Sequence, residues 1–89
     1  MGGVVGNPEE LRNFAEQLLL FKQDIESSTW GLNAKFESLS ESWNDEKQAQ
    51  FADAFSDIGM RLHDFCQQCE DYAAYLQLLA SRLDDYLGS

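Results

Sequence analysis

The chain is 89 residues long, which suits one small domain, and 44% hydrophobic with 25% charged residues is the composition of a folded protein. Sixteen acidic residues against six basic ones give a net charge of −10. This charge disfavours binding to duplex nucleic acid or anionic membranes, because those surfaces are bound through Lys and Arg. It favours a soluble acidic surface, with a nucleic-acid mimic as the alternative.

Few turns are expected, because the chain contains one Pro and six Gly. We predict a flexible N-terminus over 1–7, a first helix over 8–42, a Trp-containing turn over 43–45, a second helix over 46–87 and a C-terminal end at 88–89. No apolar run approaches the roughly 18 residues that span a membrane, and no signal peptide is visible. We therefore expect synthesis in the cytoplasm and, if the protein is secreted, no cleaved signal peptide.

The first helix has a strong start signal. Asn7 is a suitable cap, Pro8 suits the first helical position, and Glu10 has capping-box spacing from Asn7. Aliphatic residues then recur every seven positions through Gly31, where composition alone suggests a break. We predict one continuous helix with a weak point, or a kink, at Gly31. The repeat consists of Leu11, Leu18, Ile25, Leu32 and Leu39, with Phe14 and Phe21 beside it.

The second helix has its own start signal, because Asn44 or Asp45 is a suitable cap and Gln48 has capping-box spacing from Asp45. Beyond it, apolar residues alternate spacings of four and three, which predicts a helix of roughly 40 residues with a coiled-coil-like seam. We name these residues the helix-two seam: Phe51, Phe55, Ile58, Leu62, Phe65, Cys69, Tyr72, Leu76, Leu79, Leu83 and Tyr86.

A stripe of small residues runs beside the helix-two seam, and small side chains let another helix approach closely. Two helices bury one face each, so we predict that a second copy covers the apolar residues that remain. The fold class is then all-α: an antiparallel two-helix hairpin that pairs into a four-helix bundle as a homodimer. The candidate dimer-interface residues are Leu19, Trp30, Ala52, Gly59, Cys66, Ala73 and Ala80.

The only residues that suggest chemistry are His63, Cys66 and Cys69, spaced three apart. Such residues are neighbours on a helix, and Cys and His bind zinc, but three ligands leave a closed zinc site one short. A disulfide between them would be strained within a helix. We interpret the thiols as structural, with metal binding or redox chemistry as alternatives. With no nucleophile–base pair or phosphate loop, we predict no enzymatic activity, cofactor or metal.

The segment 39–45, LSESWND, followed by Phe51 and Phe55, places a Trp at the turn between two long helices. In this the chain resembles, over nearly its whole length, the WXG family of small helical-hairpin proteins of type VII secretion systems. Trp43 matches the family Trp, Asn44 the variable position, and Asp45 stands where the family has Gly. The resemblance implies a dimeric four-helix bundle without a catalytic site, which is exported or escorts a partner.

Many members of that family also carry a Tyr followed four residues later by Asp or Glu, which serves as an export signal. Here Tyr72 is followed by Leu76 and Tyr75 by Leu79. The resemblance therefore implies that export, if it occurs, depends on a partner that carries the signal.

These observations predict a non-enzymatic binding protein, a WXG-like component or substrate of a type VII-like secretion system that acts by dimerisation. Its expected partners are itself or a related hairpin and the secretion machinery, with no nucleic acid and no membrane insertion. The alternatives are an unrelated cytosolic acidic coiled-coil adaptor or scaffold, and a small thiol or metal protein. We expect Trp43 to pack between the helices, near Leu39 and Phe51.

Overall fold

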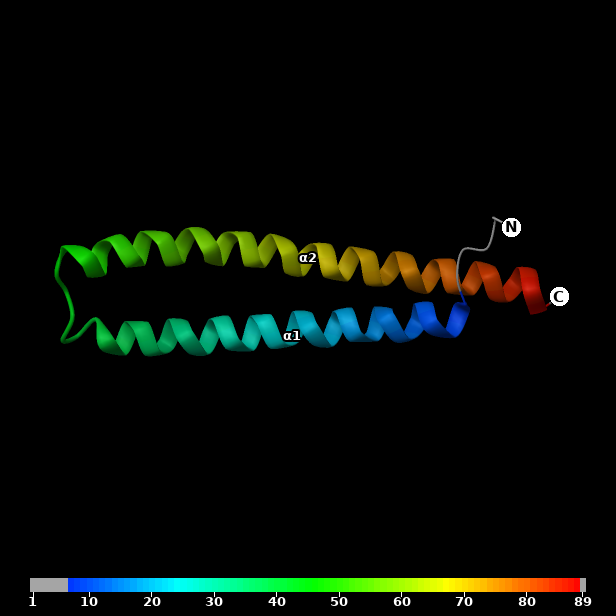
Figure 1. Cartoon of the computed structure of the whole chain (residues 1–89), viewed down its shortest axis with the longest axis horizontal. Helices are drawn as coiled ribbons and strands as arrows, with labels where there is room; N and C mark the ends of the chain where they lie inside the picture. Colours follow the sequence, from blue (N-terminus) through cyan, green and yellow to red (C-terminus); the bar gives the residue numbers. More distant parts are fainter. Residues whose placement is uncertain (1–6, 89) are drawn as a thin grey trace.

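Two long helices joined by a short turn make up the structure, a computed structural model that describes residues 7–88. Helix α1 spans Pro8–Leu39 and helix α2 spans Glu46–Gly88. The helices run antiparallel, so that the start of α1 lies beside the last turns of α2 (Figure 1). The predicted all-α hairpin is confirmed. Within these residues, neither helix has a stretch apolar enough to cross a membrane.

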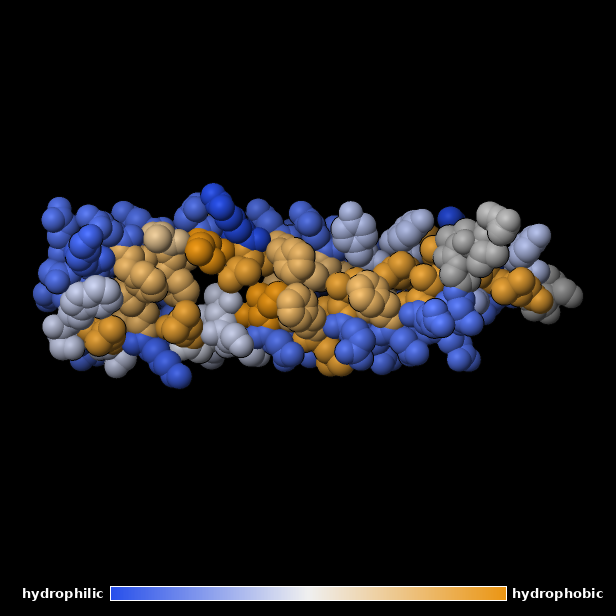
Figure 2. All heavy atoms as spheres, viewed as in Figure 1, coloured by the Kyte–Doolittle hydropathy of each residue, from blue (hydrophilic) through white to orange (hydrophobic). Residues whose placement is uncertain are grey.

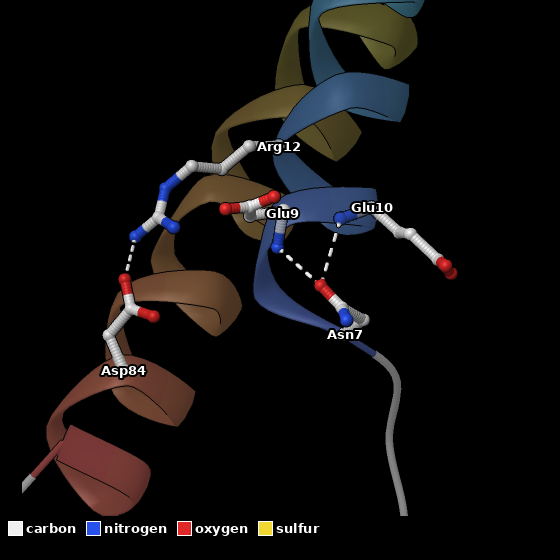
Figure 3. A network of polar contacts seen from close by, with 5 residues as sticks. All are labelled: Asn7, Glu9, Glu10, Arg12 and Asp84. Carbon is white, nitrogen blue, oxygen red and sulfur yellow. Dashed lines mark hydrogen bonds and ion pairs between the residues drawn. The ribbon is translucent and has the colours of Figure 1, made fainter.

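Asn7 is the N-cap of α1, as its position before Pro8 indicates. Its Oδ1 accepts hydrogen bonds from the backbone N–H groups of Glu9 at 2.8 Å and Glu10 at 3.3 Å (Figure 3). One turn further on, Arg12 forms an ion pair with Asp84, which ties the first turn of α1 to the end of α2. The rest of the segment expected to be flexible, 1–6, lies outside the described residues, as does residue 89.

Helix α1 continues through Gly31 without a break and ends at Leu39, three residues before the expected end at 42. The Ser40 hydroxyl donates to the carbonyl oxygen of Phe36 at 3.0 Å, and the Ser42 hydroxyl donates to that of Leu39 at 3.3 Å. The Phe36 carbonyl also accepts a bond from the Ser40 backbone N–H at 2.9 Å, and the Leu39 carbonyl accepts bonds from those of Ser42 and Trp43 at 3.0 and 2.8 Å. The serine hydroxyls add to these backbone bonds at the helix end. The serine-rich segment therefore ends the helix early.

Of the two predicted caps, Asp45 rather than Asn44 caps α2. The Asp45 side chain accepts a hydrogen bond from the backbone N–H of Gln48 at 3.0 Å, and its carbonyl accepts one from Ala49 at 3.2 Å. The Gln48 side-chain amide donates to the Ser40 hydroxyl at 2.8 Å. This bond crosses the turn and joins the end of α1 to the start of α2.

Small residues make the closest contact between the helices. The buried apolar residues are Ala15 on α1 and Cys66, Cys69, Ala73 and Ala80 on α2, none of them more than 3% exposed. Side chains of this size let two helix axes approach closely. The core of the hairpin is thus a narrow strip, with the larger apolar side chains at its edges.

This packing corrects the predicted dimer interface at three positions. Cys66, Ala73 and Ala80 are covered by the chain's own α1, so they have no surface to offer a second copy. The physical reason is the close approach that small side chains allow: the Cys66 thiol donates to the backbone carbonyl of Lys22 at 3.8 Å. The stripe of small residues serves the hairpin itself.

The prediction that the helix-two seam packs on α1 is also wrong in part, because some of its residues face solvent. Phe51, Ile58, Phe65 and Tyr72 were expected to pack on α1, yet they are 42–63% exposed. Seam residues on the neighbouring side of the helix, such as Leu62, are half-buried toward α1. Helix α2 is therefore rotated about its axis relative to the expectation, and one apolar row points away from the contact.

The hairpin is elongated, with extents of 65 × 20 × 16 Å and a radius of gyration of 19.6 Å. A compact domain of this length has a radius of gyration of about 12 Å. The accessible surface is 6872 Å², whereas a compact monomer of 10.1 kDa exposes about 5,300 Å². Two antiparallel helices have no third layer, so apolar side chains remain at the surface.

Candidate interaction surfaces

Eight large apolar side chains form one exposed surface, which we name the aromatic face. Its members on α2 are spaced seven apart and so project from one side of that helix. The ring of Phe21 packs edge-on against that of Phe65 with centroids 6.3 Å apart, which joins the rows of the two helices. The members, each 42–63% exposed, are Phe14, Phe21, Leu32 and Leu39 on α1 and Phe51, Ile58, Phe65 and Tyr72 on α2.

A shallow groove between the helices forms part of the aromatic face, and Phe14, Leu18, Phe65 and Tyr72 are among its lining residues. A hydrophobic band runs along nearly the whole hairpin over both helices, bordered by hydrophilic side chains (Figure 2). Continuous apolar patches with polar rims mark interaction surfaces, because monomers rarely expose them.

Trp43 belongs to a cluster of four aromatic rings at the turn. The Phe36 ring is at its centre, 5.0 Å from the Phe51 ring and 6.2 Å from those of Trp43 and Phe55. The Trp43 and Phe51 rings are 6.4 Å apart. Edge-on pairs at these distances are favourable. Trp43 thus contacts both helices, through Phe36 as well as the expected Phe51, while Leu39 stays half exposed.

A second groove, which we name the Trp30 groove, lies between the helices on another side of the hairpin. Its rim carries Trp30 from α1, 80% exposed, and its lining includes Ala52 and Gly59 from α2. Trp30 and Leu32 of the aromatic face are two residues apart, so they point in directions about 160° apart around α1. Of the remaining candidate dimer residues, Leu19 is half-buried on α1.

The two cysteines are buried free thiols, whereas His63 is exposed at the edge of the Trp30 groove. Burial raises the pKa of the Cys66 thiol, and the negative charge of Glu26 adds to this effect. A raised pKa lowers the fraction of reactive thiolate. Among residues 7–88, no three His, Cys, Asp or Glu side chains are grouped in a way that could hold a metal. Burial of this kind is typical of structural thiols.

Lys22 connects the two helices near the buried cysteines. Its Nζ lies 2.5 Å from a carboxylate oxygen of Glu70 on α2 and 3.6 Å from one of Glu26 on its own helix. The hydrogen bond to Glu70 raises the pKa of Lys22, and the charge of Glu26 contributes. Sequence reasoning missed this contact, because the pairing of Lys22 with Glu70 depends on how the helices are aligned. Only the i,i+4 spacing to Glu26 was visible in the sequence.

The hairpin is similar to crystal structures of the secreted protein EsxB from Bacillus anthracis str. Sterne. A point mutant of EsxB superposes with a TM-score of 0.84 at 21% identity, over 96% of each chain. Selenomethionine-labelled EsxB gives 0.81 at 21% identity, over 97% of this chain and 98% of that one. The wild type gives 0.79 at 22% identity, over 92% and 88%. The chain has the EsxB fold.

EsxB is an ESAT-like hairpin of the WXG type, so the fold implied by the sequence resemblance is confirmed. Neither a protein-family model nor a curated protein sequence matches the chain. The likeness to EsxB therefore rests on the path of the backbone over nearly the full length of both chains.

Proposed function

We propose that this chain is a non-enzymatic binding protein, a WXG-like component or substrate of a type VII-like secretion system, which acts by helix–helix association. Its first partner is a second copy of itself, or a related hairpin, and the contact is the aromatic face. The observation that carries this proposal is the aromatic face, a row of half-exposed large apolar side chains on a hairpin with no third layer.

Self-association through this face is favoured by its geometry. The aromatic face extends along both helices, so two copies related by a two-fold axis bury the same residues against each other. Four antiparallel helices then surround one apolar core, which is the usual four-helix bundle. The burial removes Phe and Tyr rings from water, and large apolar side chains contribute most to stable interfaces.

Two further features support a role in secretion. EsxB, which shares the fold, is described as a secreted protein. The turn also carries Trp43 where the WXG family has its Trp, and Asp45 caps α2 at the position of the family Gly. Because no acidic residue follows Tyr72 or Tyr75 by four positions, we propose that a partner with an export signal takes the protein across the membrane.

Sedimentation velocity at micromolar concentration tests the association. We expect a dimer for the unmodified chain and a monomer for Tyr72→Glu, because a carboxylate on the aromatic face opposes burial. Gln67→Glu adds the same charge five residues away, on an exposed position outside this face, and should stay dimeric. A monomeric unmodified chain, or equal effects of the two variants, would refute the proposed interface.

Expression with and without the genomic neighbours, followed by assay of the medium, tests the secretion role. We expect export only when a second hairpin with a signal is present. Efficient export of the chain alone would show that it carries its own signal. If the chain associates with no hairpin or secretion component, the acidic coiled-coil adaptor becomes the better account.

A further inference from the structure

The Trp30 groove is a second apolar surface that the aromatic face does not use. Trp30 is 80% exposed, although a Trp side chain carries one of the largest apolar surfaces of any residue. A dimer formed through the aromatic face leaves Trp30 in solvent, because Trp30 and Leu32 point in directions about 160° apart. Exposed Trp residues are enriched among the residues that dominate binding energy at interfaces.

The floor of the groove has room for a side chain from outside. Gly59 lies in its lining, and a Cβ placed there meets no atom within 4 Å. The side chains of Ile25 and Leu62 provide apolar walls, and both are only half-buried in the hairpin. An incoming aliphatic side chain therefore finds an apolar notch at Gly59, with the Trp30 ring at the rim.

The charge of the groove indicates the kind of partner. Glu26 and Glu37 line it, and its lining residues include no Lys or Arg, although Glu26 also pairs with Lys22 of its own helix at 3.6 Å. These two carboxylates are eleven residues apart on α1, which corresponds to about 16 Å, or three helical turns. The chain as a whole carries a charge of −10. Such a field attracts basic segments.

We propose that the Trp30 groove binds a basic amphipathic helix of a partner protein. An aliphatic side chain of that helix occupies the notch at Gly59 and contacts Trp30, and Lys or Arg residues about eleven positions apart pair with Glu26 and Glu37. A helix in an apolar groove is a common recognition mode. This inference names a partner class for the proposed binding function, but it concerns a surface separate from the aromatic face.

The test uses the full chain and a labelled synthetic helical peptide of 18 residues, with Leu along one face and two Arg eleven positions apart. Fluorescence anisotropy should show saturable binding that weakens as salt is added. A peptide of equal composition with the two Arg seven positions apart should bind several-fold more weakly. A peptide with Glu in place of Arg should not bind.

Matched variants locate the binding site. Trp30→Ala and Gly59→Leu should weaken peptide binding by at least about tenfold, because one removes a central aromatic contact and the other fills the notch. Tyr72→Ala, on the aromatic face, should leave it unchanged. Glu37→Lys should weaken binding, whereas Asp24→Lys, with the same charge change outside the groove, should not. Circular dichroism checks that each variant remains helical.

Two outcomes would overturn the proposal. Equal losses for Glu37→Lys and Asp24→Lys would show general attraction to an acidic surface. No peptide binding, together with a loss of self-association in Trp30→Ala, would show that a second copy occupies the groove. Sedimentation of the same samples distinguishes this proposal from the dimer proposal. An unmodified chain that stays monomeric contradicts the dimer, but it still presents the Trp30 groove to the peptide.

Discussion

The thiol of Cys66 on α2 donates a hydrogen bond to the backbone carbonyl of Lys22 on α1 at 3.8 Å. A side chain that reaches the main chain of the opposite helix requires the two backbones to lie close together. Only small residues permit this, and Ala73 and Ala80 continue the same row at 1% and 0% exposure. The stripe of small residues is therefore a property of one hairpin, and larger residues remain for partners.

Ala73→Leu and Ala74→Leu form a matched pair that tests this packing. Ala73 is buried against α1, so extra methylene groups there should lower the free energy of unfolding by about 1–3 kcal/mol. Ala74 is exposed, and its change should stay within about 0.5 kcal/mol. Urea denaturation followed by circular dichroism measures both. Equal effects would mean that Ala73 does not face α1.

Trp43→Ala should lower the free energy of unfolding by about 2–3 kcal/mol, because it removes a half-buried side chain and its ring contacts with Phe36 and Phe51. Trp30→Ala removes the same side chain from a position that is 80% exposed, and should change stability by less than about 0.5 kcal/mol. Thermal denaturation of the two variants side by side gives the comparison. A smaller effect at Trp43 than at Trp30 would contradict the structure of the turn.

Asp45→Ala should cost about 1 kcal/mol of stability, because the backbone N–H of Gln48 loses its side-chain acceptor at the start of α2. Asp45→Gly, which restores the residue typical of the WXG family, should cost only a few tenths of a kcal/mol relative to Asp. Asn44→Ala is the control, since Asn44 is exposed and Asp45 provides the cap. In chemical denaturation, the loss of stability should be largest for Asp45→Ala, smaller for Asp45→Gly and smallest for Asn44→Ala. A larger loss for Asn44→Ala than for Asp45→Ala would identify Asn44 as the cap.

Alkaline pH should destabilise the hairpin through Cys66. Burial raises the pKa of this thiol, so above its ordinary pKa of about 8.5 the folded chain keeps a proton that the unfolded chain has lost. The free energy of unfolding should then fall as pH rises from about 8.5. Lys22, whose pKa is raised chiefly by Glu70, acts in the same direction only above about 10.4. Urea titrations between pH 7 and 9.5 should give a shallower slope for Cys66→Ser, and parallel slopes would exclude Cys66 as the cause.

The sequence by itself determined where the helices begin and that there are two of them. Asn7 and Pro8 specify the start of α1 through local capping, and Asp45 specifies that of α2. The apolar period predicted continuity through Gly31, since a break there would have shifted the phase of the repeat. These features depend on neighbours within a few positions along the chain, so they can be read without knowledge of the opposite helix.

Only the tertiary structure decided which row of α2 faces α1. The rows through Cys66 and Phe65 are adjacent, about 100° apart around the helix, and both are apolar, so periodicity alone leaves the rotation of α2 open. The structure places the small row inside, because side chains the size of Ala73 let the backbones approach and pack densely. The bulky row then lies outside as the aromatic face. The same rotation brings Lys22 to Glu70 and leaves Trp30 at the rim of a separate groove. Neither relationship can be predicted from the spacing of residues within one helix.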